Sequence, residues 1–334
     1  MTAVLRVGLT LPSFQSEPER VLAVARAAEE AGLDGVFAFD HLFRRRGDAP
    51  EGARRPALEL LTMTAAVAAA TERIMVGTLV ARATLRPPAT LRAAFDTLAR
   101  IAPGRFIAGL GGGDDESVAE DRAFGVLPGD PPPAGGWPGP GPSPGPGVGV
   151  SPGPGAVSPG PSPRAAGSPG SEDSGPGDLG PYRLARLEAA VEALASRAYP
   201  VWVAGRSPAA LRLAAGRADG WNRWGGDAAA FAAAADRMRQ ELAAAGRDPV
   251  RFTSTWGGLA VLAPNETEAR AKRDRLGGDR PGVVWGGPSQ VAETIAGYAA
   301  AGAAWVILGP IDSSDPANAA VLGDALRLLR GTGV

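Results

Sequence analysis

The chain has 334 residues, with no Cys, one His and a formal net charge of −1. This composition excludes a disulfide framework, a thiol nucleophile and a multi-histidine metal site, and the charge balance gives no reason to expect nucleic acid as a partner. No apolar run reaches the roughly 18 residues that span a bilayer. We therefore expect a cytoplasmic protein that contacts neither membrane nor nucleic acid, holds no metal and has a small molecule as its partner.

Short apolar runs recur along the chain and predict strands. In chain order they are Arg6–Thr10, Gly35–Phe39, Ile74–Val80, Arg105–Leu110, Val201–Gly205, Gly220–Trp224, Phe252–Leu262 and Trp305–Leu308. Helical patterns fill the intervals, at residues 16–32, 56–70, 87–98, 182–196, 208–217, 228–245, 266–275, 288–301 and 317–330. The strand runs are mostly continuous rather than alternating, which is typical of parallel strands covered on both faces.

The segment 128–181 interrupts this alternation. Pro and Gly fill more than half of it, so it cannot bury enough apolar surface to offset its ordering entropy. Its glycines do not recur at every third residue, which argues against a collagen triple helix. We expect a disordered insertion at the surface of the protein.

The eight expected strands, each with a helix nearby, predict a (β/α)8 TIM barrel of the α/β class. Residues 1–127 would form its first half, with strands 1–4, and residues 182–334 its second half, with strands 5–8. The insertion 128–181 would follow strand 4. A doubly wound open sheet is the alternative, although that fold usually has fewer repeats.

In such a barrel the functional site lies at the carboxyl ends of the strands. The second strand ends in Asp40 and His41, and His41 is the one side chain whose unperturbed pKa lies near neutrality. It could donate or accept a proton there, or it could be hydrogen-bonded for structure alone. Asp114, which follows Gly113 after the fourth strand, could belong to the site or could simply cap the next segment.

The turn Gly205–Pro208 is a candidate anion site. Ser207 is suited to cap a helix and Pro208 to open it, so free backbone N–H groups would face a bound anion. Arg206 adds a cation suited to phosphate. Ordinary helix capping is the alternative interpretation, as it is for the similar opening at residues 286–289.

Six tryptophans lie outside the insertion, and some could wall a cleft for a flat ring. Trp202 and Trp305 lie inside expected strands, so we expect them in the core. Trp224 and Trp256 lie near strand ends and are the better candidates for a cleft.

Several stretches of the chain resemble the bacterial-luciferase-like superfamily of flavin- and deazaflavin-dependent oxidoreductases. They are the N-terminal RVGLTLP, EEAGLDGVFAFDHLF (Glu29–Phe43), VGTLVARATLRPPATLRAAFDTLARIAPGRFIAGLGGGD (Val76–Asp114), PVWVAGRSPAALRLAAGRADGWN (Pro200–Asn222) and GGPSQVAETIAGYAAAGAAWVIL (Gly286–Leu308). The ordered series is specific, whereas no single stretch is. It covers nearly the whole chain except the insertion, and the Asp40–His41 pair is similar to that of the deazaflavin-dependent branch.

The resemblance implies a barrel that binds coenzyme F-420 (F420) or FMN at the carboxyl ends of its strands, and we favour F420. It implies that Asp40 contacts the ring region, that His41 acts near the reacting carbon, and that the bond Leu79–Val80 is a non-prolyl cis peptide. The residues it assigns to cofactor binding are Asp40, Thr78, Leu79, Val80, Gly113, Asp114, Gly205, Arg206 and Ser207.

The implied function is transfer of a hydride between the cofactor and a small organic substrate. His41 would shuttle the accompanying proton, and Asp40 would orient His41 or the ring. An FMN-dependent monooxygenase that uses O2 and a non-catalytic cofactor-binding barrel stay open as alternatives. A homodimer also stays open. Members of the superfamily often make their dimer contact through one stretch of chain, and the insertion replaces that stretch here, so the sequence does not decide whether a dimer forms.

Overall fold

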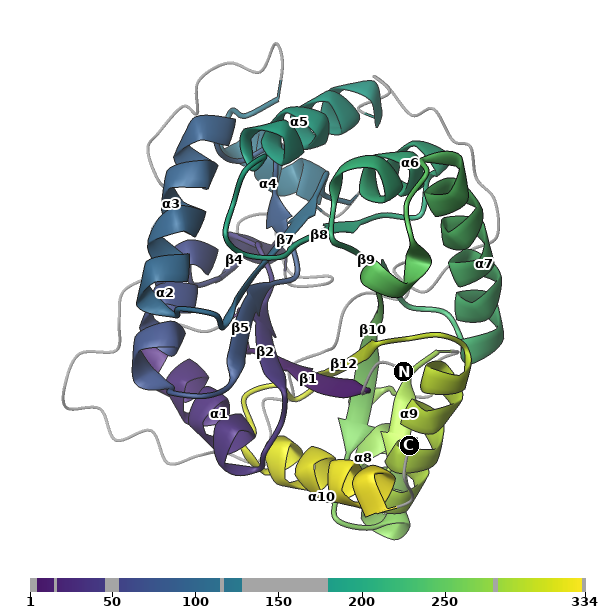
Figure 1. Ribbon diagram of the computed structural model, residues 1–334. Coiled ribbons are helices and arrows are strands. Elements are labelled where there is room, and N and C mark those ends of the chain that lie inside the picture. Colours follow the sequence, from purple (N-terminus) through teal and green to yellow (C-terminus); the bar gives the residue numbers. More distant parts are fainter. Residues whose placement is uncertain are drawn as a thin grey trace, which may run out of the picture.

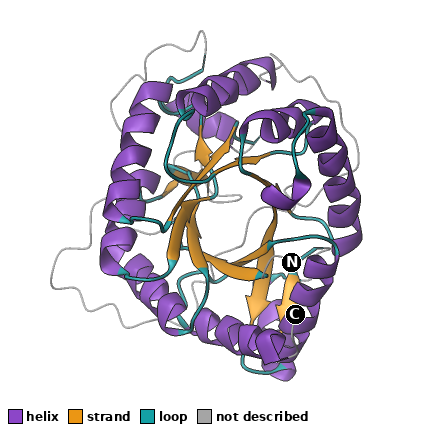
Figure 2. Cartoon of the chain, in the orientation of Figure 1, coloured by secondary structure: helices purple, strands orange, loops and turns teal. Residues whose placement is uncertain are grey.

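The computed structural model describes residues 5–14, 17–45, 54–114, 117–127, 180–278 and 282–331. Within these residues, strands form a central ring and helices surround it on the outside (Figure 1 and Figure 2). The two halves of the chain close this ring together, because the last barrel strand pairs with the first.

The barrel strands lie close to where the apolar runs predict them. They are β1 (Arg6–Thr10), β2 (Gly35–Ala38), β5 (Met75–Thr78), β7 (Phe106–Gly111), β8 (Val201–Ala204), β9 (Gly220–Trp224), β10 (Thr253–Leu262) and β12 (Trp305–Pro310). Each is parallel to its two neighbours, in the order β1-β2-β5-β7-β8-β9-β10-β12 and back to β1. The predicted (β/α)8 barrel is therefore confirmed. The open sheet is excluded, because a closed ring has no edge strand.

The surrounding helices follow the predicted intervals. They are α1 (Pro18–Glu30), α2 (Leu60–Ala70), α3 (Pro88–Ile101), α4 (Ser117–Ala123), α5 (Gly180–Ala193), α6 (Pro208–Arg217), α7 (Ala228–Ala244), α8 (Glu266–Leu276), α9 (Pro288–Ala300) and α10 (Ala317–Gly331). Among the described helices, none has the length and apolarity needed to cross a bilayer.

Some elements differ from the sequence prediction. The helix expected at residues 56–70 begins only at Leu60, because Arg54–Pro56 form β4 and pair with β3 (Phe43–Arg45). The short strands β6 (Ala81–Arg82) and β11 (Val284–Gly286) and the helix α4 were not predicted, since they are too short for a periodic pattern. Residues 15 and 16, and residues 128–179 of the predicted insertion, lie outside the described residues.

The barrel interior is filled by aromatic rings that face glycines. The rings of Phe37, Trp202 and Trp305 pack against one another with centroids 5.5–5.7 Å apart. A Cβ atom at Gly35 would lie 2.8 Å from the Trp305 ring, and one at Gly77 would lie 2.7 Å from the Phe37 ring. Glycine is therefore needed at these strand positions, because any side chain would displace a ring from the core. Trp202 and Trp305 lie in the core, as predicted.

Candidate functional site at the carboxyl end of the barrel

The end of β5 carries the backbone feature that the resemblance implied. The peptide bond Leu79–Val80 is cis, as predicted. Thr78 is fully buried, and its Oγ1 donates to Gly109 O at 2.7 Å and accepts from Gly109 N at 2.9 Å. A Cβ atom at Gly111 would lie 2.4 Å from Val80 Cγ2. The glycines of β7 thus leave the space in which this turn of β5 lies.

His41 is held by a carboxylate that the sequence did not indicate. Its Nδ1–H donates to Glu120 Oε1 at 2.7 Å, from a side chain that is 21% exposed. Burial lowers the pKa of His41, but the hydrogen bond and charge of Glu120, together with the charge of Asp114, outweigh burial and raise it above its ordinary value. With Nδ1 fixed in this way, Nε2 is left as the ring nitrogen that can exchange a proton with a ligand.

Arg82 anchors Glu120 from the opposite side. Its Nη2 donates to Glu120 Oε2 at 2.8 Å, and its Nη1 donates to Asp121 Oδ1 at 3.2 Å. The three side chains are at most 4% exposed. Because two carboxylates share one guanidinium in this dry environment, each charge depends on the others for compensation. Glu120 also accepts from Leu42 N at 2.7 Å, which ties α4 to the residue after His41.

The Asp40 carboxylate bonds to Arg82 and Arg86 and not to His41. It accepts from Arg82 N at 2.8 Å and from the Arg86 guanidinium at 2.5 and 3.1 Å. Arg86 also pairs with Glu59, the residue that caps α2. Among the described residues, the carboxylate that orients His41 is therefore Glu120 and not Asp40. Of the two roles expected for Asp40, these bonds do not support orientation of His41, because the carboxylate bonds to Arg82 and Arg86 instead. Orientation of the cofactor ring by Asp40 stays a prediction.

Asp114 occupies a capping position at the start of α4. Its Oδ1 accepts from Ser117 N at 2.8 Å and from Ser117 Oγ at 2.6 Å. Burial raises the pKa of Asp114, but the bonds from Ser117 and the charges of His41 and Arg82 outweigh burial and lower it. The preceding Gly113 has a φ of +84°, which glycine adopts without strain. Asp114 thus both caps the helix and contributes negative charge near His41.

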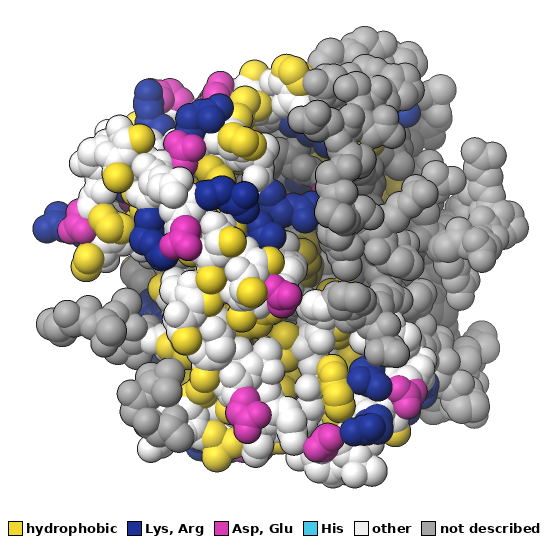
Figure 3. Space-filling model, turned by 90° about the vertical axis from the view of Figure 1, so that its right-hand side faces the viewer, with side chains coloured by type: hydrophobic (Ala, Val, Ile, Leu, Met, Phe, Trp, Pro, Cys, Tyr) yellow, Lys and Arg dark blue, Asp and Glu magenta, His cyan; other side chains and the backbone are white. Residues whose placement is uncertain are grey.

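The turn after β8 forms the helix opening that the sequence predicted. Ser207 Oγ accepts from Ala210 N at 3.2 Å, and α6 begins at Pro208. The buried Trp221 donates from its Nε1 to Gly205 O at 2.8 Å and so fixes the turn. Arg206 is exposed beside it. Figure 3 views the molecule from the side on which α6 and α7 lie in Figure 1, and it shows Lys and Arg side chains gathered on that face.

The tryptophans near the strand ends have different positions. Trp224 is partly buried and meets Phe39 edge to face, with centroids 5.2 Å apart. Trp256, in contrast, is fully buried and stacks on Tyr298 of α9, with centroids 3.8 Å apart. The expectation that Trp256 walls a cleft was wrong, because alternation along β10 turns its ring outwards into the helix layer.

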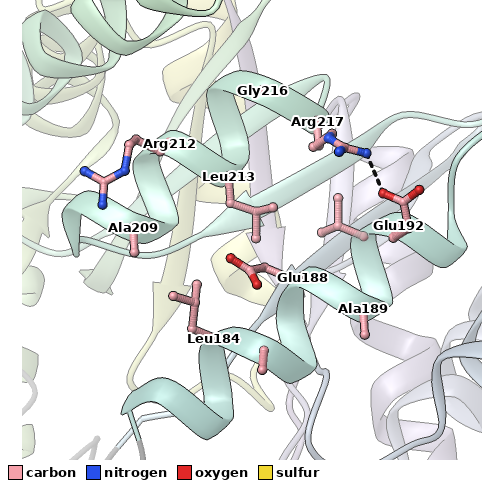
Figure 4. Close-up of a pocket in the computed structure, with 11 residues that line it drawn as sticks. Leu184, Glu188, Ala189, Glu192, Ala209, Arg212, Leu213, Gly216 and Arg217 are labelled. Carbon is pink, nitrogen blue, oxygen red and sulfur yellow. Dashed lines mark hydrogen bonds and ion pairs between the residues drawn. The ribbon is translucent and has the colours of Figure 1, made fainter.

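A groove of about 700 Å³ lies on the outside of the barrel, between α5 and α6 (Figure 4). Its lining includes several alanines and four charged residues, of which Glu192 and Arg217 pair with each other. None of the predicted site residues lines it. The strand ends, rather than this groove, therefore hold the candidate site.

The family comparison agrees with this geometry. The family model described as luciferase-like monooxygenase matches residues 3–134 and 177–304. The chain belongs to this family. The match is interrupted at residues 135–176, within the Pro/Gly-rich segment, and resumes just before α5. The resemblance inferred from the ordered series of motifs is thus confirmed.

The curated relatives match over a shorter stretch. An F420-dependent glucose-6-phosphate dehydrogenase of Beutenbergia cavernae is 40% identical over 117 residues, which are 35% of this chain and 33% of that protein. A protein of the same name from Nakamurella multipartita is 39% identical over 111 residues, or 33% of this chain and 31% of that protein. The alignment spans about a third of the length of these relatives.

Solved structures share the fold along nearly the whole chain. An F420-dependent secondary alcohol dehydrogenase, in complex with an F420–acetone adduct, has a TM-score of 0.69 at 14% identity and covers 98% of this chain and 99% of its own. The F420-dependent tetrahydromethanopterin reductase of Methanopyrus kandleri has a TM-score of 0.64 at 15% identity, with coverage of 98% and 100%. At these identities the likeness shows the fold alone.

The residues at the carboxyl end fit a flat cofactor that carries an anionic group. Phe39 and Trp224 provide aromatic surface, and the cis peptide Leu79–Val80 lies at the neighbouring strand end. Among the described residues, no carboxylate pairs with Arg206 beside the N-terminus of α6. A bound phosphate would supply a negative counter-charge for this guanidinium.

Proposed function

We propose that this protein is an F420-dependent oxidoreductase that transfers a hydride between the deazaflavin and a small organic substrate. The observation that carries the proposal is the Glu120-held His41 at the end of β2. Membership of the luciferase-like family and the F420-dependent relatives support the choice of cofactor. When bound, the cofactor supplies a ring carbon that accepts or releases a hydride.

His41 would move the proton that accompanies the hydride. Glu120 accepts from Nδ1 and so fixes the orientation of the ring, which leaves Nε2 for the ligand. The raised pKa of His41, caused by Glu120 and Asp114 against the opposing effect of burial, makes the protonated form more populated than in an ordinary imidazole at the same pH. His41 is thus suited to give a proton to a carbonyl oxygen, and its neutral form to accept one from an alcohol.

The other predicted residues would position the cofactor. Asp40 would act indirectly, because it holds Arg82 N and Arg86 in place instead of reaching His41. The backbone at Thr78–Val80, together with Gly113 and Asp114, would border the ring. Gly205, Arg206 and Ser207 would bind the phosphate at the N-terminus of α6.

A titration of the purified protein with F420 and with FMN tests the cofactor. We expect F420 to bind, with a change in its absorbance spectrum, and to bind more tightly than FMN. Tight binding of FMN without binding of F420 would contradict the choice and would favour the FMN-dependent monooxygenase. Binding of F420 with no turnover over a broad panel of alcohols and carbonyl compounds would favour the non-catalytic barrel.

Two variants test the proton transfer. We expect His41→Gln to lower kcat by roughly 10²–10⁴-fold, the usual contribution of a general acid or base, while the affinity for F420 stays near that of the wild type. Glu120→Gln should lower kcat less, and it should move to lower pH the limb of the kcat–pH profile that reports the titration of His41, because Glu120 acts through His41 by raising its pKa. Unchanged turnover in His41→Gln would remove the role assigned to His41.

A further inference from the structure

Arg223, near the end of β9, has an uncompensated guanidinium. Among the described arginines that are at least partly buried, it alone makes no hydrogen bond or ion pair. Its Nε is buried and has no partner. Partial burial of an arginine without a partner costs free energy, so an anionic ligand beside Arg223 would compensate its charge.

The groups around Arg223 add to its positive charge. Burial lowers the pKa of Arg223, and the neighbouring charges of Arg206 and Arg237 lower it further. Among the described residues, the acid that acts against them is Asp227, whose Oδ1 already accepts from Ala230 N at 2.8 Å to cap α7. The guanidiniums therefore outnumber the carboxylates at this place.

A glycine turn lies against the Arg223 guanidinium. A Cβ atom at Gly226 would lie 3.4 Å from Arg223 Nη2, and Gly225 and Gly226 have φ angles of +76° and +83°. This glycine turn precedes α7, and the turn at Gly205 precedes α6. Two helix N-termini thus belong to the two consecutive strand–helix units, β8–α6 and β9–α7, that carry Arg206 and Arg223.

Strand alternation determines which part of a ligand Arg223 can reach. The neighbours of Arg223 on β9 face the barrel interior: Asn222 donates to Thr255 Oγ1 at 2.8 Å, and Trp224 packs on Phe39. Arg223 therefore points outwards, towards the space between α6 and α7. It is suited to an anionic group at the outer end of a bound cofactor rather than to a substrate stacked over the ring.

We propose that Arg223 and Arg206, with the N-terminus of α6, bind the anionic tail of the cofactor through more than one of its anionic groups. The proposal rests on the proposed function and deepens it. F420 carries a phosphodiester followed by carboxylates, whereas FMN carries a single phosphate. Two guanidiniums, those of Arg223 and Arg206, suit such a multiply charged tail. The two arginines together would therefore favour F420 over FMN.

Binding measurements with matched ligands test this site. The probes are F420, the tail-less deazaflavin that has the same ring but no phosphate or carboxylate, and inorganic pyrophosphate. We expect Arg223→Gln and Arg206→Gln each to weaken F420 binding by about ten-fold or more, the usual effect of losing a charge-assisted hydrogen bond. The affinity for the tail-less deazaflavin should stay within about two-fold of the wild type.

Arg212→Gln is the matched control, because Arg212 lies exposed on α6 and lines the groove towards α5 (Figure 4). It should bind F420 as the wild type does. Equal F420 affinity in the wild type and in the double variant Arg206→Gln, Arg223→Gln would overturn the tail site, even if F420 binds tightly. An equal loss for F420 and for the tail-less deazaflavin would overturn it too, since the arginines would then act on the ring.

A failure of the proposed function gives a different result. If neither deazaflavin binds the wild type, the proposed function is wrong. The measurements with pyrophosphate then test the anion-binding site by itself. Stabilisation of the wild type by pyrophosphate in thermal unfolding, lost in the double variant and kept in Arg212→Gln, would support an anion site. Stabilisation that is equal in all of them, or absent in all of them, would overturn it.

Discussion

The two sides of the barrel's carboxyl end differ in whether their charged side chains are paired. At the ends of β2 and β6, the buried charges of Arg82, Glu120 and Asp40 are all paired with one another or with their neighbours. At the ends of β8 and β9, Arg206 and Arg223 have no carboxylate partner among the described residues. Both sides lie on the same closed sheet, but only on the second side do charged side chains lack a partner among the described residues.

This difference in pairing suits the two sides to different tasks, one to hold His41 in position and the other to bind an anionic ligand. Paired charges hold their own geometry without a ligand, which suits a group such as His41 that must keep a fixed orientation. Unpaired cations gain a counter-charge when an anion binds, and Arg223 is already partly desolvated before it does. The paired side therefore sets the proton-transfer geometry, and the unpaired side is suited to hold the charged end of the cofactor.

Arg82→Met gives the largest expected effect on this comparison. The substitution leaves Glu120 and Asp121 as buried carboxylates without their shared cation. We expect the free energy of unfolding to fall by about 3–5 kcal/mol, the range seen when one partner of a buried ion pair is removed. Urea unfolding measures it, with Arg212→Met as the exposed control. A loss below about 1 kcal/mol would show that the paired side is not an obligatory network.

The pH dependence of stability gives an intermediate effect. The pKa of His41 is raised above its ordinary value of 6.5 by Glu120 and Asp114, against burial. Its protonated form therefore stabilises the folded state. This contribution is complete below pH 6.5 and is lost as the pH rises through the higher folded-state pKa. We expect the loss to amount to roughly 1.5–3 kcal/mol, as for a hydrogen bond to a charged group.

Glu120→Gln isolates this contribution. With the carboxylate gone, the His41-linked excess stability of the wild type over the variant should be greatest just below pH 6.5, where Glu120 is still ionised, and should shrink as the pH rises through the folded-state pKa of His41. The single His gives one set of imidazole resonances, so an NMR titration can check that the pKa of His41 falls in the variant. Parallel pH profiles of unfolding for the two proteins, or an unchanged His41 titration, would contradict the assignment of Glu120.

Arg223→Met gives the smallest effect and the opposite sign. Because the Arg223 guanidinium lies beside like charges without a partner, an apolar side chain of similar length should leave the ligand-free protein as stable or raise its free energy of unfolding by about 0.5 kcal/mol. Urea unfolding of Arg223→Met beside Arg82→Met makes the contrast direct. If Arg223→Met instead loses more than about 1 kcal/mol, the two sides of the barrel end do not differ as described.

Local sequence signals account for the fold and for part of the site. The continuous apolar runs and the turn at Gly205–Pro208 predicted the strands and the start of α6, because both depend on neighbouring residues only. The resemblance to the luciferase-like family located the cis peptide Leu79–Val80. The acid that orients His41 gave no such signal, because Glu120 lies on a short helix, 79 residues from His41 in the sequence.

The sequence by itself thus determined the alternation of strands and helices, the residues at the strand ends and the membership of a family. Only the tertiary structure decided which charges meet. It paired His41 with Glu120 in place of Asp40, turned Trp256 into the helix layer and left Arg223 without a partner. The physical reason is that ring closure brings distant strand ends together, and burial then makes each charge depend on neighbours that no local pattern records.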